Sequence, residues 1–191
     1  MKIVAVDIDN VLNNFSDTLA GSVFTFSDSY GLSYEEFNTY LELIKHDAFA
    51  TSEFLTSKFS DFRYRIHEEC YRSAQANLAG VQFMHWLKNN GWKIVICTKR
   101  NLRLTGEATK KWLQNNHIPY DYLFMALNKI VFCKLWSVPY LIDDDNLNII
   151  HGEQYGIAVY YPIMPKHHNL PKPLTAKGFN HFEEIKQWLP K

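Results

Sequence analysis

The sequence lacks the features expected of a membrane protein, a secreted protein or a protein that wraps nucleic acid. Acidic and basic residues balance at 20 each and no long basic run is present, so we expect no polymeric nucleic acid as a partner. No apolar stretch is long enough and free enough of charge to cross a bilayer, so no membrane is expected either. The apolar N-terminal run is interrupted by Asp7, which is unlike a signal peptide.

Cysteine is also scarce. Cys70, Cys97 and Cys133 are an odd, scattered set without the spacing of a metal site. They are typical of reduced thiols in a cytosolic protein, and we therefore expect a cytoplasmic location. Of the 191 residues, 47% are hydrophobic and 15% are aromatic, which is ample for a packed core. The length predicts one domain, with room for an inserted subdomain.

Polar side chains follow an apolar run near the start of the sequence. Residues 2–7 predict the first strand, and because its β-branched and small residues do not alternate cleanly with polar ones, we expect it to be buried on both faces, as in a parallel sheet. This run ends in Asp7 and Asp9. Two later predicted strands end in the same way: strand 93–98 ends in Thr98 and is followed by Lys99 and Arg100, and strand 140–143 ends in Asp143 and is followed by Asp144 and Asp145.

The residue types at these strand ends suit a phosphoryl group and a hard cation. Ligands of open α/β sheets bind at the carboxyl ends of the strands. If the three strands are parallel neighbours, their acids, hydroxyl and cations share one crevice. Carboxylate oxygens can hold a hard cation, and the hydroxyl and the basic side chains can hold a phosphoryl group. The strand ends are therefore the candidate site.

The rest of the chain predicts strands that alternate with helices, which indicates an α/β fold with a doubly wound parallel sheet. The expected helices are residues 81–88, 107–116, 129–136, 146–154 and 182–189, with strands at 122–125 and 157–161 and a loop over 167–177. Residues 16–79 are rich in aromatic residues and read as helical pieces, one of them opened by Ser33 and Glu36 at capping-box spacing. We predict a core of residues 1–15 and 80–191, with a helical cap of residues 16–79 inserted after the first strand.

The strand-end motifs resemble those of the haloacid dehalogenase (HAD) superfamily of phosphotransferases, in order and in spacing. The matching residues are Asp7-x-Asp9-x-Val11 for the first motif, Thr98 for the second and Asp143-Asp144 for the fourth. Within the superfamily the chain is most similar to the small 5'(3')-deoxyribonucleotidases of the 5'-nucleotidase type C family. That similarity lies in the stretch from Asp7 to Phe15 and in Leu141-Ile142-Asp143-Asp144.

The resemblance implies a role for each motif residue. Asp7 would be the nucleophile that forms an aspartyl-phosphate, and Asp9 the general acid–base, a task that needs a raised pKa. Thr98 would bind the phosphoryl oxygens. The lysine of the third motif is Lys129 or Lys134, and its position at the start of a helix favours Lys129. From the residues alone, each Asp could instead cap a turn, and the Thr could simply suit a strand.

A Mg²⁺ cofactor is the next implication. Asp7, the backbone carbonyl of Asp9 and Asp143 would be its ligands, while Asp144 would orient a water or the motif lysine. An acid-rich helix N-terminus is the alternative, and it suits Asp145 better than the other two acids.

Specificity residues are harder to assign. Phe15 would lie against a nucleotide base, or it is a core residue. Lys99 would bind the substrate phosphate, as Arg100 could, unless both are solvated. His167 and His168 lack zinc-site spacing and are expected to be exposed. Four aromatic residues of the cap stay unassigned: Phe54, Phe59, Phe62 and Tyr64.

The sequence as a whole predicts a Mg²⁺-dependent phosphatase that hydrolyses nucleoside or deoxynucleoside 5'-monophosphates through an aspartyl-phosphate. One alternative is a HAD phosphatase for a sugar phosphate or another small phosphoester. A second is a nucleotide-binding module without catalysis, and the retained motif residues oppose it. A metal-dependent nuclease is disfavoured by the absence of a basic groove. Whether the chain forms a homodimer through the cap is left open.

Overall fold

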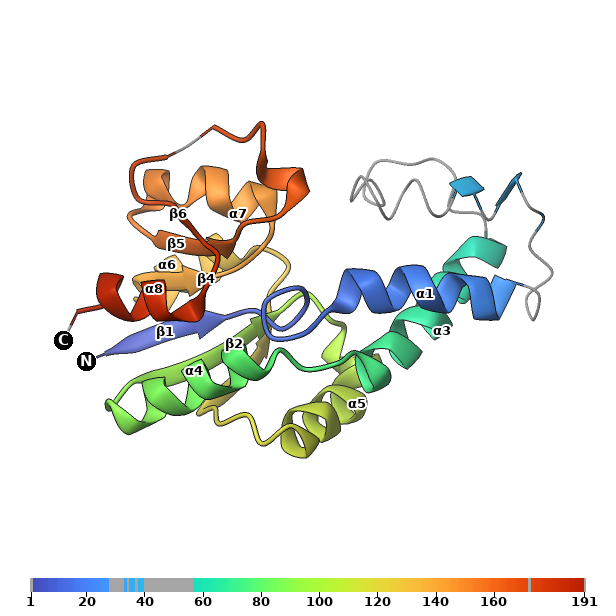
Figure 1. Cartoon of the computed structure of the whole chain (residues 1–191), viewed down its shortest axis with the longest axis horizontal. Coiled ribbons are helices and arrows are strands. Elements are labelled where there is room, and N and C mark those ends of the chain that lie inside the picture. Colours follow the sequence, from blue (N-terminus) through green and yellow to red (C-terminus); the bar gives the residue numbers. More distant parts are fainter. Residues whose placement is uncertain are drawn as a thin grey trace. The chain divides into compact units, whose positions relative to one another are not determined.

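The computed structural model describes residues 2–27, 33, 35–36, 38–39, 57–171 and 173–190. The chain divides into two compact units (Figure 1). The core unit comprises Met1–Asn13 and Ala76–Lys191, and the inserted unit comprises Asn14–Gln75. Phe54, one of the aromatic residues of the predicted cap, lies outside the described residues.

The inserted unit is helical in its described parts. Helix α1 (Phe15–Ser27) and helix α3 (Ser57–Ser73) pack against each other. The predicted capping box is confirmed, because the Ser33 backbone N–H donates to Glu36 Oε2 at 2.7 Å and the Glu36 N–H donates to Ser33 Oγ at 3.2 Å. Phe15, at the start of α1, stacks on Tyr71 with ring centroids 5.3 Å apart.

The core unit contains a six-stranded parallel sheet in the order β3-β2-β1-β4-β5-β6, as predicted for a doubly wound fold. The strands are β1 (Ile3–Val6), β2 (Lys93–Thr98), β3 (Tyr122–Met125), β4 (Tyr140–Ile142), β5 (Ala158–Pro162) and β6 (Lys177–Phe179). The helices are α4 (Leu78–Asn89), α5 (Leu102–Asn115), α6 (Lys129–Leu135), α7 (Asn146–His151) and α8 (Phe182–Trp188), with the short 3₁₀ helices η3 (Glu153–Tyr155) and η4 (Pro165–His167).

Two hydrophobic clusters cover the two faces of the sheet. Alternate residues of β1 point to opposite faces, so Val4 and Val6 pack on one side and Ile3 and Ala5 on the other. The Val4 side is closed by α4, α5 and α8, and the Ala5 side by α6 and α7. This burial on both faces explains why β1 reads as a continuous apolar run.

Two elements differ most from the prediction. Strand β5 is not the last strand, because β6 pairs with it in parallel through Tyr160 and Lys177. Helix α5 begins at Leu102 rather than near residue 107, since Asn101 caps it by accepting a hydrogen bond from the Arg103 N–H at 3.1 Å.

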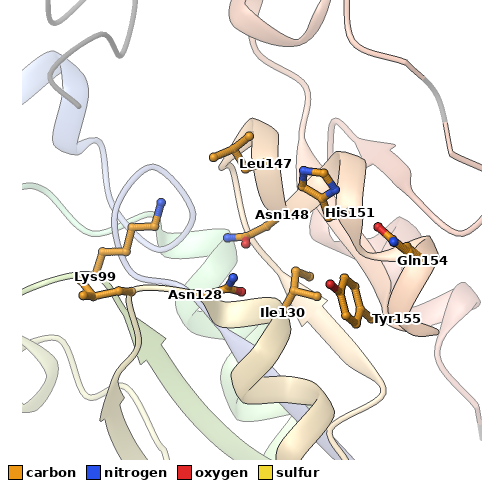
Figure 2. A pocket seen from close by; sticks show the side chains of 9 residues that line it. Lys99, Asn128, Ile130, Leu147, Asn148, His151, Gln154 and Tyr155 are labelled. Atoms are coloured by element: carbon orange, nitrogen blue, oxygen red, sulfur yellow. The ribbon is translucent and has the colours of Figure 1, made fainter. Parts of the chain in front are cut away.

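No helix among the described ranges is long and apolar enough to cross a membrane. A cavity of about 340 Å³ lies beside α6 and α7 (Figure 2). Its walls are formed by Lys99, Leu127, Asn128, Ile130, Leu147, Asn148, His151, Gln154 and Tyr155.

Candidate active site

Asp7 lies where β1 ends, between the ends of its two neighbouring strands. Val6 is in register with Ile96 of β2 and with Ile142 of β4. The Asp7 backbone N–H donates to the Ile142 carbonyl at 2.9 Å, which continues the pairing by one residue. Asp143 directly follows Ile142, so the parallel register itself brings the two carboxylates together.

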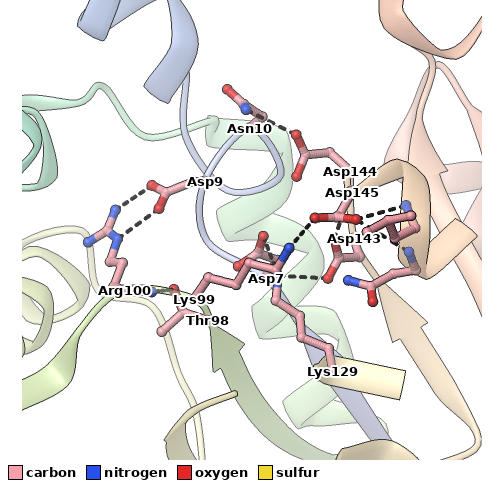
Figure 3. A network of polar contacts seen from close by, with 12 residues as sticks. Asp7, Asp9, Asn10, Thr98, Lys99, Arg100, Lys129, Asp143, Asp144 and Asp145 are labelled. Carbon is pink, nitrogen blue, oxygen red and sulfur yellow. Dashed lines mark hydrogen bonds and ion pairs between the residues drawn. The ribbon is translucent and has the colours of Figure 1, made fainter. Parts of the chain in front are cut away.

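Lys129 joins these two carboxylates (Figure 3). Its Nζ lies 2.6 Å from Asp7 Oδ2 and 2.7 Å from Asp143 Oδ2, and its side chain is only 1% exposed. Asn128 caps α6 by accepting from the Val131 N–H, which places Lys129 in the first turn of that helix. Lys134, the other sequence candidate, is exposed and donates to the Tyr155 carbonyl instead.

The local charges strongly shift the proton affinities of this cluster. Burial raises the pKa of Asp7 to about 8; Lys129 opposes the rise, and Asp143 and Asp144 add to it. Burial also raises the pKa of Asp143. Burial acts to lower the pKa of Lys129, but the two carboxylates outweigh it and hold that pKa above its ordinary value. Lys129 is therefore charged, and its single positive charge does not balance the carboxylates around it.

Three buried carboxylates lie within reach of one ion. Ligand oxygens of Asp7, Asp143 and Asp144 all lie within 4.8 Å of one another. Among the described residues, Asp7 Oδ1 is buried and has no hydrogen-bond partner. Hard oxygen donors, surplus negative charge and an orphaned carboxylate oxygen together fit a small divalent cation such as Mg²⁺. The cluster contains Asp144 in addition to the Asp7 and Asp143 side chains expected from the sequence.

Asp144 is held by the turn after β1 (Figure 3) and also by the segment after β5. Asn10 Nδ2 lies 3.0 Å from its Oδ2, and Lys166 Nζ lies 2.7 Å from the same oxygen. Asn10 has a φ of 60°, a left-handed conformation that Asn tolerates better than most residues. These contacts fix the third acid from two directions.

His167 is buried, which contradicts the expected exposure of the two histidines. The Met164 N–H donates to His167 Nδ1 at 3.2 Å, so the ring proton is on Nε2, which donates to the Asp144 carbonyl at 2.9 Å. The expectation holds for His168, which is exposed. The Pro-flanked segment turns His167 inward at η4, and sequence spacing could not show this.

Asp145 caps α7, as its position next to the strand end predicted. Its Oδ1 accepts hydrogen bonds from the Leu147 N–H at 2.8 Å and the Asn148 N–H at 3.4 Å. Its other carboxylate oxygen pairs with the exposed Lys99. A substrate-binding role for Lys99 therefore requires the lysine to exchange this partner.

Asp9 faces away from the Asp7 cluster and toward Arg100 (Figure 3). Arg100 Nη2 lies 2.6 Å from Asp9 Oδ1 and Arg100 Nε lies 3.0 Å from Asp9 Oδ2. Burial acts to raise the pKa of Asp9, but the Arg100 guanidinium outweighs it and holds that pKa below its ordinary value. The raised pKa expected for Asp9 is thus wrong for this state, because the sequence did not reveal its partner.

Thr98 ends β2, next to β1, and is buried. Its Oγ1 accepts the Arg100 backbone N–H at 3.1 Å. Phe15 belongs to the inserted unit, where it contacts His67 as well as Tyr71, and its contact with a base stays a prediction. Of the predicted site residues, only Lys99 also lines the cavity beside α6 and α7.

Solved structures resemble the whole chain, although no protein-family model and no curated protein matches it. A haloacid dehalogenase-like hydrolase from Streptococcus pneumoniae is 13% identical, with a TM-score of 0.66 over 100% of this chain and 99% of that one. A predicted phosphoglycolate phosphatase from Haemophilus somnus is 16% identical, with a TM-score of 0.66 over 100% and 98% of the two chains. A putative β-phosphoglucomutase from Thermotoga maritima is 18% identical, with a TM-score of 0.59 over 99% and 98%.

The chain has the HAD-like fold. Sequence reasoning found the residues at the strand ends of this fold and missed the residues that hold them. Arg100, Asn13 and Lys166 each contact a predicted site acid from a loop. For Arg100 a usable indication existed, since it stands two residues after Thr98 at the same strand end.

Proposed function

We propose that this protein is a Mg²⁺-dependent phosphatase of small phosphoesters and that its preferred substrates are nucleoside or deoxynucleoside 5'-monophosphates. The observation that carries the phosphatase proposal is the buried Lys129 between Asp7 and Asp143. A nucleophilic carboxylate beside a fixed cation and two further acids suits transfer of a phosphoryl group. The HAD-like fold supports this proposal, because neighbours with that fold include a predicted phosphoglycolate phosphatase.

In the proposed reaction Asp7 attacks the phosphorus atom of the substrate. A bond forms between an Asp7 oxygen and phosphorus, the ester P–O bond breaks, and the leaving alkoxide takes up the proton that Asp9 accepted from water in the preceding cycle. Lys129 offsets the charge near Asp7, and Thr98 is placed to bind phosphoryl oxygens. Water then attacks the aspartyl-phosphate, which frees inorganic phosphate and regenerates Asp7.

Asp9 suits the second half of this cycle best. Its ionised carboxylate can accept a proton from the attacking water, and that proton then serves the next leaving alcohol. Asp7, Asp143 and Asp144 would hold the Mg²⁺, whose positive charge would favour the ionised form of Asp7 and neutralise the phosphoryl oxygens.

Fewer observations support the substrate class than support the reaction. Nucleotides are supported by the resemblance of the Asp7–Phe15 stretch to deoxyribonucleotidases and by Phe15 as an aromatic surface for a base. A sugar phosphate is the second candidate, favoured by neighbours that include a D,D-heptose 1,7-bisphosphate phosphatase from Burkholderia thailandensis. We further propose that the protein is cytoplasmic.

The test is phosphate release from a panel of nucleoside monophosphates and sugar phosphates, with Mg²⁺ or with EDTA. We expect Mg²⁺-dependent release that Asp7→Asn lowers by at least about a thousandfold. Asp121→Asn is the matched control, because Asp121 contacts Lys88, Lys93 and the Ile94 N–H at the opposite end of β2. Release from sugar phosphates alone would remove the nucleotide assignment, and nucleotide binding without release would remove the phosphatase.

A further inference from the structure

Arg100 is a buried cation, whereas most of the other basic side chains in the described part of the chain are exposed. Its side chain is fully buried, and its guanidinium meets the Asp9 carboxylate with two donors, Nη2 at 2.6 Å and Nε at 3.0 Å. A planar fork against a planar carboxylate fixes distance and orientation together, which a lysine cannot do. The pair therefore sets where the Asp9 carboxylate can point.

The guanidinium is itself held by α5. Arg100 Nη1 donates to Thr109 Oγ1 at 3.4 Å, and its Cζ lies 5.9 Å from the centre of the Trp112 ring. At the other end of the residue, the backbone N–H donates to Thr98 Oγ1. Helix α5 and the end of β2 thus hold the guanidinium in place independently of Asp9.

Asp9 is held from its own side as well. Asn13 Nδ2 donates to Asp9 Oδ1 at 3.1 Å, and the Asn10 N–H donates to Asn13 Oδ1 at 3.0 Å. The carboxylate therefore accepts three hydrogen bonds, two from Arg100 and one from the turn in which Asp9 lies. Arg100 (Figure 3), which α5 holds in place, and the turn after β1 together fix the orientation of this carboxylate.

We infer that Arg100 is a positioning residue that holds the Asp9 carboxylate in the orientation used for proton transfer. This inference rests on the proposed function, in which Asp9 handles the proton. It differs from the sequence-based expectation that Arg100 adds charge at the phosphate, because both Nη2 and Nε face Asp9 and Nη1 faces Thr109. Arg100 acts on the reaction through Asp9 and leaves phosphate binding to other residues.

The first experiment compares Arg100→Met and Arg100→Lys with the wild type, using p-nitrophenyl phosphate. We expect Arg100→Met to lower kcat about a hundredfold, the loss typical of a displaced catalytic group, with KM changed less than threefold. The inhibition constant of inorganic phosphate should stay within threefold. Arg100→Lys should recover part of kcat, and the exposed Arg103→Met, at the start of α5, is the matched control.

The second experiment places the same change in an Asp9→Asn background. If Arg100 acts through Asp9, Arg100→Met lowers the residual rate by less than about threefold there. A tenfold rise in KM or in the phosphate inhibition constant would instead place Arg100 at the phosphoryl group and overturn the inference. An unchanged kcat in folded Arg100→Met would overturn it too. If that variant fails to fold, Thr109→Val should lower kcat several-fold at constant KM.

A readout without turnover separates this inference from the proposed function. The Nε–H resonance of Arg100, assigned in a nitrogen–proton NMR spectrum by its loss in Arg100→Lys, should shift in Asp9→Asn and stay in place in Asp121→Asn. If the Arg100 Nε–H resonance does not shift in Asp9→Asn, the inference is overturned even if the enzyme is active. A wild type that releases no phosphate from any substrate overturns the proposed function, while the resonance still reports on the contact.

Discussion

Replacing Lys129 by methionine tests the electrostatics of the candidate site without any knowledge of the substrate. Methionine fills much of the volume of the lysine stem and removes only the charged end, so little cavity is created. The change leaves Asp7 and Asp143 facing each other without their common cation. Because Lys129 and Asp143 are at most 1% exposed and Asp7 is 8% exposed, water screens this loss poorly.

Removing one partner of such a buried pair destabilises proteins by about 3–5 kcal/mol. We expect Lys129→Met to lower the free energy of unfolding by that amount at pH 8 in EDTA, a large part of the 5–15 kcal/mol typical of a domain. The measurement is urea unfolding followed by the fluorescence of the five tryptophans. Lys134→Met, on the same helix but exposed, should change the stability by less than about 0.5 kcal/mol.

The raised pKa of Asp7 predicts how the destabilisation by Lys129→Met changes with pH. The pKa of Asp7 is already raised to about 8, so its contribution to stability is fully present below its ordinary pKa of about 4 and is lost as the pH rises toward 8. Without Lys129 the carboxyl pKa values rise further. The difference in the free energy of unfolding between Lys129→Met and the wild type should therefore be larger at pH 8 than at pH 5. A gap below 1 kcal/mol at pH 8, or one that is larger at pH 5, would refute the reasoning.

Two further predictions concern stability away from the site. The pKa of Asp121 is held below its ordinary value, because hydrogen bonds from Lys88 and from the backbone outweigh the effect of burial. Asp121→Asn should therefore lower the free energy of unfolding by about 1 kcal/mol at pH 7, and urea unfolding at pH 3 should show the difference fading as wild-type Asp121 is protonated. At Gly152 an added Cβ would lie 2.4 Å from Val159 Cγ2, so Gly152→Ala should cost about 1–3 kcal/mol in the same assay. At Gly106 an added Cβ would lie at an ordinary 3.8 Å from Leu102 Cβ, so Gly106→Ala should instead be stabilising by about 0.5–1 kcal/mol in α5, and equal effects of the two substitutions would contradict this account.

The strand ends could be predicted because their determinants are local. A β-branched run followed by an acid or a hydroxyl carries both the strand and its polar end within a few residues, as at Val6–Asp7 and at Ile142–Asp143. The parallel order of the sheet then brings these ends together without further information from the sequence. Lys129 was favoured over Lys134 for a similar reason, since the helix start after Asn128 is a local feature.

The contacts of Arg100 and His167 could not be predicted, because they depend on partners far away in the sequence. Arg100 is buried among partners that include Thr109 and Trp112 of α5 and Asp9 of the first turn. His167 is buried beside the Asp144 carbonyl, although the identical residue after it is exposed. The sequence does not show which of two adjacent histidines is buried. The structure does, because the 3₁₀ helix η4 ends at His167 and turns that side chain inward.

Strand β6 was missed because a three-residue strand carries almost no periodicity. It contains Gly178, which has low strand propensity, and it pairs only with β5 at the edge of the sheet. The close approach of Ile163 and Tyr161 to Gly178 leaves little room for a side chain there. The glycine that weakened the prediction is thus the residue that lets the strand fit.

The central position of β1 has a consequence for the synthesis of the chain. Val6 is made before both of its partners, Ile96 and Ile142, so the strand that carries Asp7 is paired on both sides only after residue 142 has left the ribosome. Contacts this distant along the chain slow folding, and an unpaired central strand is an open edge at which other chains can add. The nascent protein must therefore keep an apolar β1 from aggregating until β4 arrives, and the same late event that closes the sheet also assembles the acids of the site.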